Sequence, residues 1–95
     1  MTETLTHFIN GEAVSGALDG VSINPSDTAE IVARYPKGDA NLVDEAVRAA
    51  RSAFPAWANA SPELRSDLLD KVGSTIMARA GTLGALLARE EGKTL

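Results

Sequence analysis

The sequence predicts an α+β chain in which short strands come first and three helices follow. In the first third, apolar residues alternate or form short β-branched runs between Asn-Gly and Asn-Pro dipeptides, a pattern typical of strands joined by tight turns. After residue 39 the apolar residues recur every three or four positions, the period of an α-helix. A chain of 95 residues makes at most one small domain. We therefore expect N-terminal β-hairpins and three helices in one unit, without repeats or linkers.

Composition excludes several classes of function. The hydrophobic content of 44% is ordinary for a soluble globular chain, and the net charge of −4 comes without a Lys/Arg cluster, which argues against nucleic-acid binding. The absence of cysteine removes disulfides, thiolate metal sites and any thiol nucleophile carried by this chain. No basic leader followed by an apolar segment is present, and no apolar run is long enough to cross a bilayer. The expectation is a cytoplasmic protein with no membrane partner.

The first predicted hairpin turns at Asn10-Gly11. Phe8 and Ile9 precede this dipeptide, which suits a type I′ turn because both central residues must accept a positive φ. A tight two-residue turn is therefore expected here.

A second strand pair is expected to turn at Asn24-Pro25. Val21 and Ile23 alternate before this dipeptide, and the strand pattern resumes with Ile31, Val32, Ala33 and Tyr35. Proline sets φ for a turn, and the polar residues that follow can bond the local backbone.

The first predicted helix begins after Asp39, a suitable N-cap residue. Pro55 is expected to end or kink this helix, which leaves Trp57 just beyond it as a packing anchor rather than a ligand-stacking residue. The apolar stripe that should be buried comprises Val43, Val47, Ala50 and Phe54.

The second predicted helix has three start signals in a row, with Ser61 as N-cap, Pro62 at the first helical position and Glu63 in the first turn. Gly81 and Gly84 are expected to interrupt the helical pattern before a third, weaker helix begins near Leu83. The expected buried face of the second helix comprises Leu64, Leu68, Leu69, Val72 and Ile76.

The segment Gly92-Lys93-Thr94 looks like the end of a phosphate-binding loop. That motif also requires a glycine five residues before Gly92 and a preceding strand, whereas Leu87 occupies the position and helix formers precede it. We instead expect Gly92 to end the third helix in the left-handed conformation, with Lys93 near the negative end of the helix dipole.

Few residues offer chemistry. His7 is the only histidine and has no acidic or hydroxyl partner at a telling spacing, so no catalytic or metal role is expected for it. Glu90 and Glu91 are neighbours on a helix and point in different directions, which favours a solvated helix end over a catalytic pair. The sequence thus predicts no catalytic and no cofactor-binding residue within the 95.

Four stretches, in order, resemble the beginning of the NAD(P)-dependent aldehyde dehydrogenase superfamily. They are "FINGE", "INPSDTAEIVARYPKGDANLVDEAVRAARSAFPAW", "SPELRSDLLDKVGSTI" and "LLAREEGKTL". No single stretch is specific, but their order and spacing cover nearly the whole chain. Three residues depart from the family pattern: Ala13 replaces a frequent tryptophan, Ala29 a glycine, and Arg89 an apolar residue. Ala29 weakens the expectation of a left-handed turn at that loop, and the other two suggest looser packing.

The resemblance implies that residues 1–95 are the N-terminal part of the coenzyme-binding domain in the α/β aldehyde dehydrogenase fold, which has a Rossmann-like coenzyme domain. Family members oxidise an aldehyde to a carboxylate with NAD or NADP through a cysteine adduct, and they form homodimers or homotetramers. The cysteine, the catalytic domain and the nucleotide-binding strands are all expected outside this chain, which alone should be inactive. The ending resembles members that act on semialdehydes, such as α-ketoglutaric semialdehyde.

The resemblance also implies one candidate metal site. Some members hold a monovalent cation with backbone carbonyls and an acidic side chain, at positions that match Ser22, Ile23 and Glu90 here. Hard oxygen ligands suit such an ion. The alternative for the whole chain is a stand-alone helical interaction module without catalysis.

Overall fold

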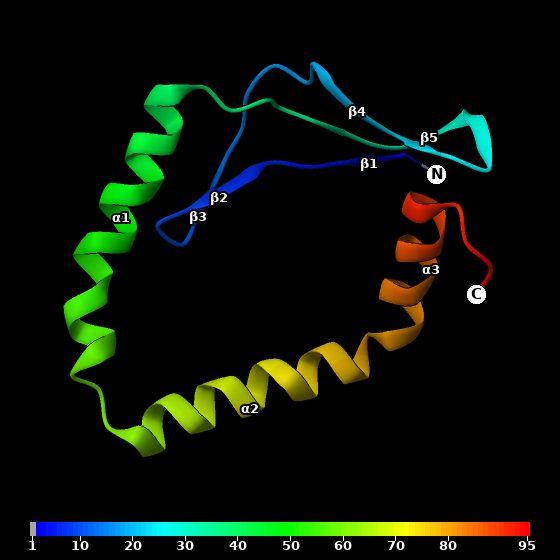
Figure 1. The fold of residues 1–95 in the computed structure, drawn as a ribbon. Helices are drawn as coiled ribbons and strands as arrows, with labels where there is room; N and C mark the ends of the chain where they lie inside the picture. The colour runs from blue at the N-terminus through cyan, green and yellow to red at the C-terminus, as the bar shows by residue number, and fades with distance from the viewer. Residues whose placement is uncertain (1) are drawn as a thin grey trace.

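The computed structural model describes residues 2–95 and has the predicted order of strands before helices. The strands gather at one end, and the helices follow one another away from it and back, so that α3 returns to the sheet (Figure 1). The elements are β1 (Glu3–Thr4), β2 (His7–Ile9), β3 (Glu12–Val14), β4 (Gly20–Asn24), β5 (Asp27–Tyr35), α1 (Ala40–Ala58), α2 (Pro62–Ala78) and α3 (Ala80–Glu91).

The first hairpin forms as predicted. Strands β2 and β3 are antiparallel, with His7 opposite Val14. Asn10 and Gly11 have φ values of 54° and 76°, so both turn residues take the positive φ that a type I′ turn requires. The Asn-Gly prediction is confirmed.

The second sheet has the order β1-β5-β4. The predicted pair β4 and β5 is antiparallel, and Asn24 opposite Asp27 leaves Pro25 and Ser26 as the turn. Sequence reasoning missed β1, which pairs in parallel with β5. Two polar residues carry no alternation signal, so this strand exists only through its contact with β5. Among the described residues, Val32 and Ala33 on β5 are almost completely buried, and Pro36 just after this strand is also buried.

Helix α1 starts as predicted but does not stop at Pro55. The Asp39 side chain accepts a hydrogen bond from the backbone N–H of Leu42 at 2.8 Å, which confirms the N-cap. The helix continues through Pro55 to Ala58, so Trp57 lies inside it and not beyond it, where it is 41% exposed. Of the two expectations for Pro55, that it ends the helix or kinks it, the first is wrong. Proline removes only one hydrogen bond of the ladder, and the last turn still closes through Asn59 N–H to Pro55 O at 3.0 Å.

Helices α2 and α3 are separated by one residue, Arg79. Ser61 caps α2 by accepting from the backbone N–H of Leu64 at 3.1 Å, as predicted. Helix α3 begins earlier than expected, and Gly81 and Gly84 lie within it instead of interrupting it. Each glycine costs about 1 kcal/mol relative to alanine, which weakens a helix without forbidding it.

The predicted buried faces of the helices are exposed. The large apolar side chains of the α1 stripe and the α2 face are 44–66% exposed, so these faces are not covered within this chain. The chain exposes 7348 Å², whereas a compact chain of this mass would expose about 5,200 Å². Its radius of gyration is 16.9 Å against about 12 Å for a compact domain of this length. Strand β2 contacts α1, but the large apolar side chains of the α1 stripe and the α2 face stay exposed.

Candidate functional site

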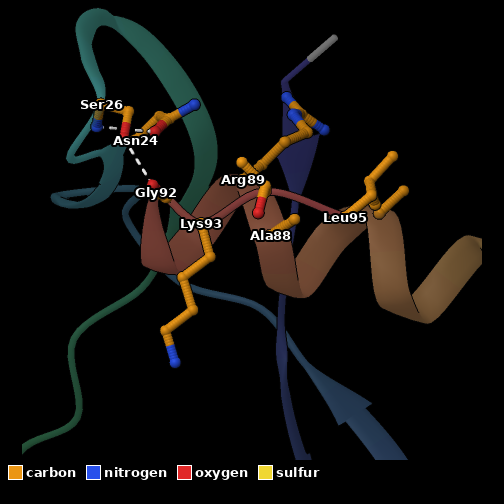
Figure 2. Close-up of a pocket in the computed structure, with 9 residues that line it drawn as sticks. Asn24, Ser26, Ala88, Arg89, Gly92, Lys93 and Leu95 are labelled. Carbon is orange, nitrogen blue, oxygen red and sulfur yellow. Dashed lines mark hydrogen bonds between the residues drawn. The ribbon is translucent and has the colours of Figure 1, made fainter.

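The end of α3 meets the β4–β5 turn, and we call this contact the α3–turn junction: residues 22–30 of the strand pair together with residues 89–95. An open pocket of about 450 Å³ lies at this junction (Figure 2). The residues that line the pocket are Asn24, Ser26, Ala85, Ala88, Arg89, Gly92, Lys93, Thr94 and Leu95.

The turn is organised by Asn24. Its side-chain oxygen accepts from the backbone N–H of Ser26 at 2.9 Å, a local bond that asparagine commonly makes in turns. Its side-chain nitrogen donates to Glu30 Oε2 at 2.8 Å. One asparagine therefore holds the turn and orients the carboxylate of Glu30.

Glu30 and Arg89 join the sheet to α3. Arg89 Nε lies 2.5 Å from Glu30 Oε1, and the two side chains are 27% and 30% exposed, respectively. Hydrogen bonds from Asn24 and then from Arg89 lower the pKa of Glu30 below its ordinary value of 4.5. The expectation that Arg89 loosens the packing is therefore corrected, because its charge finds a carboxylate on β5.

Gly92 ends α3 as predicted, with φ 70° and ψ 25°. The backbone N–H groups of Gly92 and Lys93 both donate to Ala88 O, which is the pattern of a glycine-terminated helix. Ser26 Oγ donates to Gly92 O at 2.5 Å. A Cβ on Gly92 would lie 2.8 Å from Ser26 Oγ and 3.0 Å from Ser26 N, so the close approach also requires glycine.

The phosphate-loop interpretation fails on this geometry. A phosphate-binding glycine loop leads into a helix, where free N–H groups and the positive dipole end face the anion. Gly92 instead follows a helix and lies at its negative end. The Lys93 side chain points away from the turn in Figure 2 and pairs with Glu91 at 3.0 Å.

Two of the three predicted cation ligands lie together. Ser22 Oγ donates to Glu90 Oε1 at 3.3 Å, which places the α3 carboxylate against β4. Ile23 follows on β4 at an irregularity in the ladder, where the register shifts on both sides. Within residues 2–95 no three or more acidic or histidine side chains are grouped for a metal. The cation stays a prediction.

His7 lies in β2, opposite Val14. Its Nε2 atom is buried and makes no hydrogen bond within residues 2–95. Its ring lies near Gly38, where an added Cβ would be 3.8 Å from His7 Cε1. A catalytic role for His7 gains no support from these contacts.

Sequence reasoning missed Glu30 and the two roles of Asn24. The one available signal was Arg89, a charged residue on a helix rich in alanine and leucine, which required a partner if that face were covered. The partner is 59 positions away in the sequence, so no spacing rule could identify it.

The lowered pKa of Glu30 gives a prediction about acid. The folded protein binds a proton at Glu30 less readily than the unfolded chain, so the stabilisation is complete above about pH 4.5 and is lost as pH falls through the lowered pKa. We expect the stability difference between the intact protein and its Glu30→Gln variant to be largest near neutral pH and to shrink in acid, measured by denaturant unfolding across pH. The matched control is Glu45→Gln, at an exposed position on α1. A difference that is independent of pH would contradict this role of the carboxylate.

No helix of the described residues has the length and apolar character needed to cross a membrane.

Residues 15–95 match the aldehyde dehydrogenase family. Over 85 residues, which cover 90% of this chain and 16% of each relative, the sequence is 36% identical to 1-pyrroline-5-carboxylate dehydrogenase of Anoxybacillus flavithermus and 39% identical to 1-pyrroline-5-carboxylate dehydrogenase 2 of Bacillus subtilis. It is 34% identical to malonate-semialdehyde dehydrogenase of Pseudomonas aeruginosa over 97% of this chain and 18% of that relative. The chain thus spans less than a fifth of the length of these curated relatives. The chain belongs to the aldehyde dehydrogenase family.

Proposed function

We propose that this chain is the N-terminal portion of an enzyme that oxidises an aldehyde to a carboxylate with NAD⁺ or NADP⁺. The observation that carries the proposal is the family match over residues 15–95, together with 34–39% identity to three dehydrogenases. On this proposal residues 1–95 form part of the coenzyme-binding domain, and the nucleotide-binding strands and the catalytic domain lie outside them.

The role of this segment in the enzyme would be structural. Oxidation through an acyl adduct needs a nucleophile such as a cysteine thiolate, which adds to a carbonyl and later leaves the acyl group. The 95 residues contain no cysteine, so the reacting group would come from elsewhere in the protein. The exposed apolar faces of α1 and α2 support a segment that packs onto further structure.

We further propose a semialdehyde as the substrate class. The support is the name of one relative, malonate-semialdehyde dehydrogenase, and the resemblance of the "REEGKTL" ending to semialdehyde-specific members. We also propose a cytoplasmic homodimer or homotetramer, because members of the family form such oligomers. No residue of this chain is proposed to bind NAD or NADP.

The test is a comparison of two preparations. The intact protein should reduce NAD⁺ or NADP⁺ when given malonate semialdehyde or a related semialdehyde, followed by the absorbance of the reduced nicotinamide. The purified 95-residue chain should show no such reduction. Activity in the short chain would overturn the proposal, because that chain has no cysteine to acylate.

The alternative, a helical interaction module without catalysis, is less well supported. It would account for the exposed helix faces but not for the family match across β4, β5 and all three helices. An intact protein that reduces neither coenzyme with any aldehyde of a broad panel would favour it.

A further inference from the structure

Three charged side chains meet at the α3–turn junction: Glu30 from β5, and Arg89 and Glu90 from α3. We propose that Arg89 is a built-in cation that holds the end of α3 on the sheet, so that the junction needs no bound metal ion. Arg89 is then a positioning residue for the α3 terminus, and the proposal does not rest on the enzymatic activity proposed above.

The first support is the geometry of the ion pair. Arg89 Nε and Glu30 Oε1 are 2.5 Å apart, and Asn24 donates to the other carboxylate oxygen at 2.8 Å. Both oxygens of Glu30 are therefore bonded, and one of the two donors carries a full positive charge. About 70% of each side chain of the ion pair is shielded from solvent, so water screens this pair less than a fully exposed one.

The second support is the small number of charged oxygen ligands for the predicted ion. Sites for hard cations collect several oxygen atoms around the ion. The predicted ligand atoms at Ser22 and Ile23 are uncharged backbone carbonyls, so Glu90 is the one charged ligand among the three, and its Oε1 already accepts from Ser22 Oγ. The other carboxylate of the junction, Glu30, already holds the guanidinium. One carboxylate, Glu90, is therefore left for an ion, and the contact between α3 and the sheet is already made without it by the Arg89–Glu30 pair and the bond from Ser26 to Gly92.

The third support is the position of Arg89 in the last turn of α3. A cation there interacts favourably with the negative end of the helix dipole. Three residues later, Gly92 O accepts from Ser26 Oγ, so the ion pair and this bond hold the same helix end to the same strand pair. Together they fix the direction in which residues 93–95 leave the helix.

The test compares salts at equal ionic strength on the intact protein. Thermal unfolding is measured in KCl, NaCl and choline chloride, since choline is too large and too weakly coordinating to occupy an oxygen site. We expect the same midpoint in all three salts. A saturable increase in midpoint with K⁺ or Na⁺ over choline would overturn the proposal and support an ion at Ser22, Ile23 and Glu90.

Variants test the residue itself. Arg89→Met keeps an unbranched stem without charge and should lower the midpoint by roughly 1–3 °C in the longer intact protein. The same change should cost much less when introduced into Glu30→Gln, because the pair is already broken. Lys93→Met is the matched control, since Lys93 pairs with Glu91 at the surface and should tolerate the change.

An equal loss from Arg89→Met in both backgrounds would show that Glu30 is not its functional partner and would overturn the proposal, as would no loss in either. If Arg89→Met does not fold, the salt comparison on the unsubstituted protein still decides the question.

Discussion

Shortening one leucine on α2, Leu68→Ala, is expected to lower the free energy of unfolding of the intact protein by about 2–5 kcal/mol. Leu68 lies on the apolar face of α2 and is 44% exposed in this chain. If the remainder of the intact protein covers that face, the substitution removes buried methyl groups and leaves a cavity. Denaturant unfolding of the intact protein measures the loss.

The purified 95-residue chain should respond differently. There the same substitution should change stability by no more than about 0.5 kcal/mol, because much of the leucine already contacts water. The chain should also bind a hydrophobic dye or self-associate, as expected of exposed apolar surface. Met77→Ala is the matched control for the intact protein, since Met77 is 75% exposed and lies off the α2 face. Equal losses at Leu68 and Met77 would contradict a covered α2 face, and so would a compact chain that melts cooperatively without binding dye.

Replacing Gly92 by alanine should destabilise the intact protein by at least about 1–2 kcal/mol, the cost of a left-handed conformation for an L-residue. The backbone at Gly92 has φ 70°, and the added Cβ would lie 3.0 Å from Ser26 N and 3.2 Å from Pro25 Cβ. The substitution therefore strains the helix end and also pushes it away from the β4–β5 turn. Thermal or denaturant unfolding would measure the sum of the strain and the lost contact as a single decrease in stability.

Two further variants separate those effects. Ser26→Ala removes the hydroxyl that is 2.8 Å from the added Cβ, so Gly92→Ala should cost less in that background than in the unsubstituted protein. Gly84→Ala is the control in the 95-residue chain, where nothing lies within 4 Å of its added Cβ. That change should raise helix content, because alanine is preferred to glycine by about 1 kcal/mol in a helix interior. If Gly92→Ala and Gly84→Ala lowered the stability of the 95-residue chain by similar amounts, the left-handed conformation of Gly92 would not be the cause of the loss.

Local chemistry explains which predictions succeeded. Asn10-Gly11, Asp39, Ser61 and Gly92 each act on the backbone within a few residues, and each was placed correctly from the sequence. The wrong predictions concern residues that destabilise a helix locally while their neighbours favour it. Pro55 removes one hydrogen bond from α1, and two glycines weaken α3, yet neither helix ends there. The presence of a proline or glycine shows that a helix loses stability at that position. It does not show whether the remaining residues of the helix compensate for the loss.

Contacts between distant segments account for what was missed. Strand β1 exists only beside β5, and Glu30 meets Arg89 across 59 positions. The departure of Arg89 from the family pattern indicated that something had changed at this position, but the direction of the effect depended on an acidic partner that no local rule reveals.

By itself, the sequence determined the order of strands and helices, their caps and turns, and the family, because these depend on residue type and on short spacings. Only the tertiary structure decided that α3 returns to the β4–β5 turn, that Ser22 approaches Glu90, and that Arg89 neutralises Glu30. It also showed that the helix faces are patterned for burial and yet uncovered. The physical reason is that periodicity specifies which side of a helix is apolar, whereas burial and charge pairing depend on which segments fold back against it.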